Sequence, residues 1–197
     1  MLRDFDLLGS AIGTPDFVAG HTLQRVQAGK QLLDAIASLE DPQVGLHLLR
    51  ACAGHCRLLH SLRCNPPAAQ RPALLQFDAY VRACFSSFTG LHLDPSQWGQ
   101  ASRGFGHAGL GLRATAADVP AAYLASVGGC AVACSDLDAA FPAATLQSVP
   151  HVVQTLAAFN EQVAGGVPLT AGAVLVLIIN DLWQCSGGAG WGRSGKL

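Results

Sequence analysis

The sequence predicts a mainly α fold, an antiparallel helical bundle with a short N-terminal strand or turn before it. Apolar residues recur at spacings of three, four and seven along most of the chain, which indicates helices with one buried face. Proline follows a capping residue in pairs such as Thr14-Pro15 and Asp41-Pro42, an order typical of helix starts. The connections between the predicted helices are short enough for antiparallel packing.

The chain is predicted to begin with a short strand and a long helix. Leu7 to Ile12 forms the strand, and Gly13 ends it. Thr14 supplies the oxygen that caps the helix, and Asp16 suits its positive end. One buried stripe is predicted along this helix: Val18, Val26, Leu33, Ile36 and Leu39.

A second helix is predicted from Gln43 to about Arg63, and Asn65-Pro66-Pro67 stops it because proline cannot continue the hydrogen-bond ladder. Arg50 and Arg57 project from one side, so the helix has a basic face opposite its core face. The core face contains Val44, Leu48, Cys52, His55, Leu59 and Leu62.

The later helices follow the same start and stop signals. A third helix begins near Arg71-Pro72 and ends at Gly90, and Asp94-Pro95 opens a short fourth helix that contains Trp98. Four glycines between residues 104 and 111 then indicate a loop with unusual backbone freedom. Two further helices are predicted at residues 118–126 and 149–163.

These elements divide the chain into three parts: a strand and turn at 1–13, a helical domain at 14–163 and an unrelated tail at 164–197. With 50% hydrophobic and 13% charged residues, the chain is too apolar for a disordered protein and less charged than a typical soluble domain. The tail is apolar and then rich in glycine and serine, and we interpret it as the product of an altered reading frame or a truncated copy.

Cysteine usage and apolar runs predict a cytoplasmic or nuclear protein. Seven cysteines, an odd number at irregular spacings, favour reduced thiols, and Met1 to Asp6 lacks the apolar segment of a secretory signal. The most hydrophobic run, Ala171 to Ile179, is shorter than the roughly 20 residues that span a bilayer. We therefore expect no membrane partner.

Charge is distributed unevenly along the chain, whose net charge is -1. Between His47 and Arg113, seven arginines stand against Asp78 and Asp94, whereas both flanking segments are acidic. A basic middle between acidic ends indicates a surface that faces phosphate, although ordinary solvated arginines give the same pattern.

Two glycine motifs resemble nucleotide-binding sequences and fail on context. Gly104 to Gly109 spells the dinucleotide motif, but a helix rather than the required strand is predicted before it. Gly190 to Lys196 resembles a phosphate-binding loop, but Leu197 replaces the hydroxyl residue that holds magnesium. We predict no cofactor.

Candidate metal and catalytic groups also lack the expected arrangement. Structural zinc sites usually take pairs of ligands from separate segments, whereas the candidates here recur along one helix: Cys52, Cys56, His60 and Cys64. The paired carboxylates Asp4-x-Asp6 and Asp136-x-Asp138 have no third carboxylate partner. We predict no metal site, no catalytic residue and no enzymatic activity.

Several stretches resemble one known family. Gln97 to Ala101, His107 to Arg113 and Ala121 to Ser126, with Leu7 to Gly13, resemble the segment after the catalytic palm in reverse transcriptases of non-LTR, LINE-type retrotransposons. The resemblance covers about residues 7–163. One departure is Ala108, where the family more often has glycine.

The resemblance implies a thumb that packs against a template–primer duplex, preceded by part of the grip on the primer strand. The family's paired catalytic aspartates lie upstream of the Leu-Gly element, and only Met1 to Asp6 stand there, so the resemblance implies a fragment without the polymerase active site. The residues expected to contact nucleic acid are Leu8, Gly9, Ile12 and Gly13 in the grip, and Arg50, Arg57, Arg63, Arg103 and Arg113 in the thumb.

Three functional readings follow from these observations. The first is weak, salt-sensitive binding of an RNA–DNA or RNA template–primer duplex by the thumb. The second is a helical protein-interaction module, or self-association, through the surface that would face a palm. The third is a product without function. Arginines that share one face favour the first reading, and arginines scattered among acids favour the second.

Overall fold

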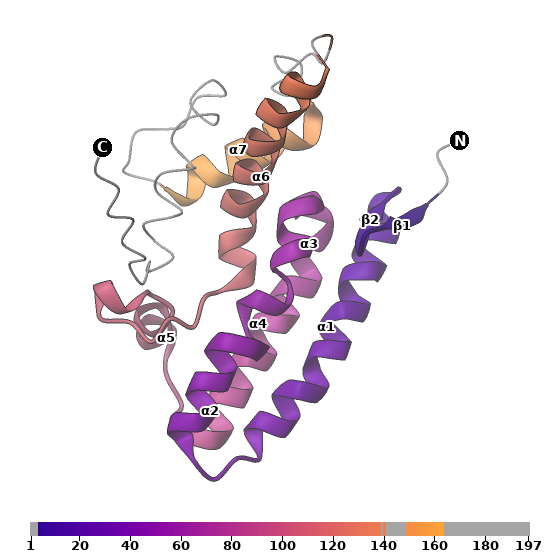
Figure 1. Ribbon diagram of the computed structural model, residues 1–197. Coiled ribbons are helices and arrows are strands. Elements are labelled where there is room, and N and C mark those ends of the chain that lie inside the picture. The colour runs from indigo at the N-terminus through magenta and orange to yellow at the C-terminus, as the bar shows by residue number, and fades with distance from the viewer. Residues whose placement is uncertain (1–3, 139, 141–148, 164–197) are drawn as a thin grey trace, which may run out of the picture.

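The computed structural model describes residues 4–138, 140 and 149–163, and Figure 1 shows that helices follow a short N-terminal hairpin in this part of the chain. The predicted mainly α fold is confirmed. The predicted tail at 164–197, with its glycine motif and apolar run, lies outside the described residues. The elements are β1 (Phe5–Leu7), β2 (Ser10–Ile12), α1 (Pro15–Ala37), α2 (Pro42–Leu48), a π-helical turn η1 (Leu49–Ala53), a 3₁₀ turn η2 (His55–Arg57), α3 (Leu59–Cys64), α4 (Pro67–Thr89), α5 (Pro95–Ala101), a 3₁₀ turn η3 (Phe105–His107), α6 (Thr115–Leu137) and α7 (Pro150–Gln162).

The N-terminal segment is a hairpin, and the prediction of one strand from Leu7 to Ile12 is wrong. β1 and β2 pair antiparallel around a two-residue turn, Leu8-Gly9, in which both residues have positive φ, 53° and 79°. Such turns match the twist of the paired strands, and glycine adopts this conformation freely, whereas leucine is strained in it. The sequence pattern missed the turn because leucine is uncommon at its first central position.

Two side chains from other elements hold the hairpin. The Arg25 guanidinium on α1 donates to the Gly9 carbonyl at 2.9 Å, and the Ser10 hydroxyl donates to Asn65 Oδ1, just after α3, also at 2.9 Å. Both Ser10 and Asn65 are buried, so this hydrogen bond forms away from solvent and is correspondingly costly to break. The hairpin is therefore fixed to the helices rather than free.

Helices α1 and α4 lie side by side and run in the same direction (Figure 1). The Gly29 position on α1 is so close to Phe77 that an added Cβ would lie 3.2 Å from the ring. Further along both helices, the Cys84 thiol donates to the Leu33 carbonyl at 3.3 Å. The segment from α2 to α3 connects α1 to α4 along the chain, and it runs in the direction opposite to both helices.

The core lies where these helices meet. Phe77, Leu74 and Leu62 are fully buried, and each such side chain contributes about 1.5–3 kcal/mol when it leaves water. The predicted stripe on the first helix is confirmed at Val18, Val26, Leu33 and Ile36, which are buried, while Leu39 is partly buried against the same core.

The helix predicted from Gln43 to Arg63 is interrupted, which corrects the sequence analysis. Between α2 and α3 the backbone passes through η1 and η2, and the break lies at Gly54, with φ -85° and ψ -137°. Its N–H donates to the Leu49 carbonyl at 2.7 Å, and an added Cβ would lie 2.7 Å from the same oxygen. Glycine is the residue that permits this approach, and it is also a poor helix former.

Two later helices begin earlier than predicted. Helix α4 begins at Pro67 rather than near Arg71-Pro72, and α6 spans Thr115–Leu137 rather than 118–126. Both contain an internal proline within the first two turns, where only one ladder hydrogen bond is lost. The sequence analysis placed the starts at those prolines because proline is typical of the first helical position.

The start of α6 is capped by an acidic side chain from α4. Asp78 Oδ1 accepts hydrogen bonds from the Thr115 N–H at 2.7 Å and the Thr115 hydroxyl at 2.6 Å, and Oδ2 accepts from the Ala116 N–H at 3.0 Å. These donors have no partner within α6 itself. Burial raises the pKa of Asp78, and the three hydrogen bonds oppose that rise only in part.

Helix α6 is long and apolar enough to cross a membrane, judged by length and composition alone. Its first half is nevertheless packed inside the protein, where Val119 and Leu124 are fully buried. Helix α7 packs on the middle of α6 through Val152, next to Tyr123 and Leu124. Of the most apolar 18-residue window of α6, 35% is buried inside the protein.

Replacement of Asp78 tests the cap. We expect Asp78→Ala to lower the free energy of unfolding by roughly 2 kcal/mol, because the N–H groups of Thr115 and Ala116 lose their acceptor and the Thr115 hydroxyl keeps only the Leu74 carbonyl. Asp78→Asn retains one acceptor oxygen, so its free energy of unfolding should decrease less than that of Asp78→Ala. Glu40→Ala, at an exposed position between helices, is the control and should change stability by less than about 0.5 kcal/mol. Urea denaturation measures all three, and an unchanged Asp78→Ala would contradict the proposed role of the cap.

Candidate functional site

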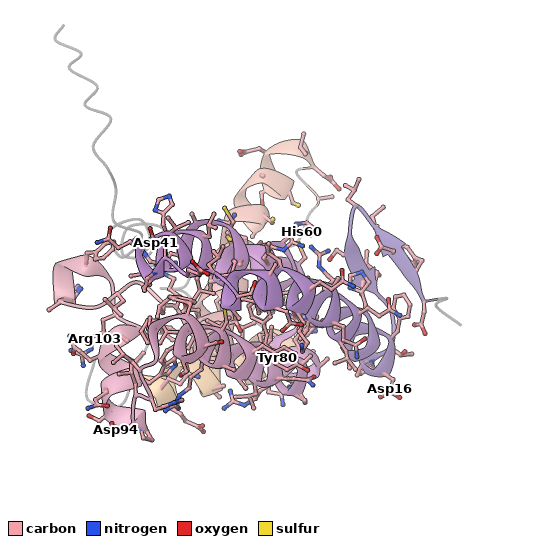
Figure 2. All side chains as sticks on the ribbon, turned by 90° about the horizontal axis from the view of Figure 1, so that it is seen from below. Asp16, Asp41, His60, Tyr80, Asp94 and Arg103 are labelled. Carbon is pink, nitrogen blue, oxygen red and sulfur yellow. The ribbon has the colours of Figure 1, made fainter. Side chains whose placement is uncertain are left out.

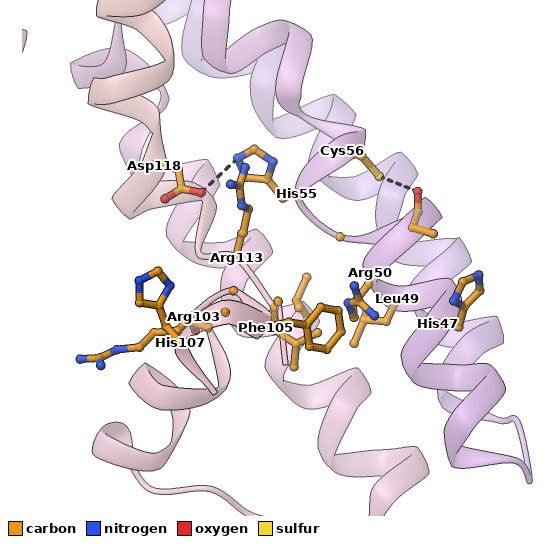
Figure 3. Close-up of a pocket in the computed structure, with 18 residues that line it drawn as sticks. His47, Leu49, Arg50, His55, Cys56, Arg103, Phe105, His107, Arg113 and Asp118 are labelled. Atoms are coloured by element: carbon orange, nitrogen blue, oxygen red, sulfur yellow. Dashed lines mark hydrogen bonds and ion pairs between the residues drawn. The ribbon is translucent and has the colours of Figure 1, made fainter. Parts of the chain in front are cut away.

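A cleft of about 760 Å³ opens where η1 and η2 face the loop between α5 and α6 (Figure 3). Three arginines line it, Arg50 from η1 and Arg103 and Arg113 from the loop. One acidic residue, Asp118 on α6, stands among the lining residues. The other named side chains are His47, His55, Cys56, Phe105 and His107.

Helix α5 supports the loop from one side. The short fourth helix predicted after Asp94-Pro95 is confirmed, and its start carries a capping box between Asp94 and Gln97. Trp98 anchors this helix on α4, because its ring packs edge-on against Phe85 with centroids 5.8 Å apart. Gln100 then donates to the carbonyls of His107 and Ala108, at 2.9 and 3.0 Å.

Glycine is required inside the loop by close backbone approach. An added Cβ on Gly109 would lie 2.0 Å from the Arg103 carbonyl oxygen, so any other residue would force the loop apart. Ala108 has φ 56°, a left-handed conformation that glycine adopts without strain.

The dinucleotide motif in this loop does not form a dinucleotide site. Residues 104–109 follow helix α5 and form the 3₁₀ turn η3, so no strand precedes them. The motif works only where a strand turns directly into a helix whose N-terminus holds the pyrophosphate. The expectation that a helix precedes this motif is confirmed.

Arg50 is stacked on Phe105 inside the cleft. Its guanidinium carbon lies 4.0 Å from the ring centroid, within the range of a cation–π contact. Its Nε is buried and has no hydrogen-bond partner among the described residues. Phe105 itself is 62% exposed, so one face of an aromatic ring in the cleft remains in contact with solvent.

His55 and Asp118 face each other across the cleft, with His55 Nε2 3.4 Å from Asp118 Oδ2 (Figure 3). Burial, together with a smaller effect of the nearby Arg113, lowers the pKa of His55 to about 4. Burial also raises the pKa of Asp118, and Arg113 opposes this effect. At neutral pH the imidazole is therefore uncharged, and the arginines supply the positive charge of the cleft.

The structure brings together three of the five predicted arginines. Arg50, Arg103 and Arg113 line the cleft, with Arg103 exposed and Arg50 and Arg113 partly buried. Figure 3 shows Arg103 reaching outwards from the loop, whereas Arg113 points toward His55. Arg57 and Arg63 are exposed but do not line the cleft, because the break at Gly54 redirects the segment that carries them.

The residues predicted to grip the primer strand lie apart from the cleft. Leu8, Gly9, Ile12 and Gly13 belong to the hairpin or its end, and none lines the cleft. In Figure 2, Arg103 lies at the opposite end of the molecule from Asp16, which begins α1 just after the hairpin. The two sets of predicted contacts therefore do not form one continuous site.

The sequence analysis missed three residues of the cleft. His55 was expected on the core face, Asp118 as a helix start, and Phe105 only as part of a glycine motif. One signal could have indicated that Phe105 is exposed: it stands between two glycines of a predicted loop, and loops lie on the surface.

The cysteine and histidine candidates do not converge. The Cys56 thiol donates to the Ala51 carbonyl at 3.4 Å, and the Cys64 sulfur lies 3.8 Å from His60 Nδ1. Within the described ranges, no group of three or more His, Cys, Asp or Glu side chains is arranged to hold a metal ion.

Comparisons with known proteins identify no relative: no family model, no curated protein and no solved structure matches the chain.

Acid should destabilise the protein through His55. Its pKa is about 4 in the folded protein and about 6.5 when unfolded, so its contribution to stability is complete above pH 6.5 and falls as pH drops toward 4. When the pH falls from 7 to 4.5, we expect the free energy of unfolding of His55→Gln to decrease by about 2 kcal/mol less than that of the wild type. His47→Gln, at an exposed position of the same cleft, is the control. Equal pH slopes in urea denaturation for all three proteins would contradict a buried neutral His55.

Proposed function

We propose that the chain binds nucleic acid through the cleft, as the thumb-like domain of a non-LTR reverse transcriptase would. The observation that supports this most is the convergence of Arg50, Arg103 and Arg113 on one cleft with a single acidic residue, Asp118. Guanidinium groups match the geometry of phosphate oxygens and keep their charge at all physiological pH values. The role proposed is binding rather than catalysis.

Burial of acidic groups strengthens the positive potential of this region. Of the two aspartates among the seven arginines from His47 to Arg113, Asp78 is turned inward to cap α6. Burial also raises the pKa of Asp118, which disfavours its negative charge. The exposed Arg57, Arg63 and Arg103 then add to a field that attracts a polyanion from a distance.

The likeness to a thumb rests on the order of the helices together with the family resemblance. Consecutive long elements, α1, α2–α3, α4 and α6, alternate in direction around one core, which suits an antiparallel bundle. Contacts from such a domain to phosphates would position a template–primer duplex without reading its sequence.

Arg103 is the residue with which to test this function. It is exposed at the rim of the cleft, so replacement should leave the fold intact. We expect Arg103→Gln to weaken binding to a labelled RNA–DNA hybrid with a single-stranded overhang, and to reduce the slope of log affinity against log salt by about 1. Arg71→Gln, an exposed arginine on α4 away from the cleft, should bind as the wild type does.

Fluorescence anisotropy over a salt series measures these slopes on protein shown to be folded by circular dichroism. A folded wild type that binds no nucleic acid at low salt would overturn the proposed function. Equal losses in the two variants would instead show that the cleft has no special role.

The hairpin supports a second candidate function, a protein-interaction surface. Leu8 is 90% exposed at the turn, and Phe5, Leu7 and Ile12 are also exposed, so four large apolar residues of one short hairpin face solvent. Apolar groups gathered in this way are typical of surfaces that contact another protein or a second copy of the same chain.

Self-association through the hairpin has a direct test. If the hairpin is such a surface, the wild type should sediment as a concentration-dependent oligomer, and Leu7→Lys should shift it to the monomer by placing a charge in the contact. Leu75→Lys, at an exposed leucine on α4, is the matched control and should leave the oligomer unchanged. A wild type that is monomeric at all concentrations would contradict self-association.

A further inference from the structure

We infer that the cleft takes an unpaired stretch of nucleic acid, with one base stacked on Phe105. This inference rests on the proposed function and specifies which part of a template–primer the cleft binds. The cleft volume, about 760 Å³, lies within the range of about 300–1,000 Å³ of small-ligand sites. Sites of this size hold drug-sized ligands, so the cleft can take a short unpaired segment and not a double helix.

Phe105 has the geometry of a stacking platform. Arg50 covers one face of its ring at 4.0 Å, and the ring is 62% exposed overall. An added Cβ on the next residue, Gly106, would meet nothing within 4 Å, so the loop is open at the position that follows Phe105. A base placed on the uncovered face would complete a stack of base, ring and guanidinium, as in sequence-tolerant single-strand binding.

Arg50 Nε is buried in the same cleft, and its hydrogen-bonding capacity is not used by the described residues. His55 Nε2 is also buried without a hydrogen bond, although Asp118 Oδ2 lies 3.4 Å away. Buried polar groups usually find partners, and a bound phosphate or base edge would supply acceptors for them. Arg103 at the rim is placed to contact the phosphates of the strand as it leaves the cleft.

A stacking platform requires the loop that carries Phe105 to be held in place. Helix α5 holds the C-terminal end of η3 and the residues after it, since Gln100 donates to the His107 and Ala108 carbonyls and the Ala101 carbonyl accepts the Leu110 N–H at 2.9 Å. A ring held in this way loses little conformational freedom when a base stacks on it, which favours binding.

The test measures how replacement of Phe105 changes binding to a single strand and to a duplex of the same length. We expect the full chain to bind a fluorescent oligothymidine more tightly than a blunt DNA duplex of the same length, and Phe105→Leu to weaken single-strand binding by roughly 5- to 100-fold. Phe105→Trp should retain binding, because it keeps a stacking surface. Phe5→Leu, at an exposed aromatic residue of the hairpin, is the matched control.

A second readout reports stacking itself. A 2-aminopurine in the strand should lose fluorescence on binding to the wild type and to Phe105→Trp, and should keep it with Phe105→Leu. Tight duplex binding with no effect of Phe105→Leu would overturn this inference and leave the proposed function standing. Absence of binding to both single strand and duplex by folded protein would overturn both.

Discussion

The cap that Asp78 places on α6 is the interaction on which the arrangement of the cleft depends. It joins the middle of α4 to the first residues of α6 through three hydrogen bonds at 2.6–3.0 Å. The loop between α5 and α6 is thereby held at both ends, by Trp98 on one side and Thr115 on the other. Phe105 and Arg113 stand in this loop, and they reach the cleft only because the loop cannot drift from α4. The partly buried Asp78 carboxylate thus helps to set the position of Arg113 in the cleft.

Local sequence signals predicted the starts of helices well where the cap lies next to the helix in the chain. Thr14 caps α1 and Asp94 caps α5, as expected from their side-chain oxygens. The same reasoning failed for α6, because its cap comes from Asp78, 37 residues earlier in the sequence. It failed again at Gly54, where a single glycine breaks a run whose apolar spacing is otherwise helical. Local patterns contain no information about partners that the fold supplies.

The candidate site was likewise predicted in part from local sequence, and the rest of it depends on residues far apart in the chain. Net charge by segment pointed to the region from His47 to Arg113, and three of its arginines do share a cleft. The assumption of one continuous helix also placed Arg57 beside Arg50, and the break at Gly54 separates them. Phe105 could not be recognised as a platform from spacing alone, because its exposure depends on Arg50, which lies 55 positions earlier and covers only one face of its ring.

The parallel pairing of α1 with α4 has a consequence for how the chain folds. Antiparallel neighbours such as α3 and α4 meet across short loops, whereas the Cys84 to Leu33 hydrogen bond spans 51 residues. Closing so long a segment carries a larger entropic penalty and slows folding relative to bundles built from local contacts alone. Close approach of Gly29 to Phe77 belongs to this long-range interface. The two helices that form most of the core should therefore be the last to dock, after the intervening segment has already taken shape between them.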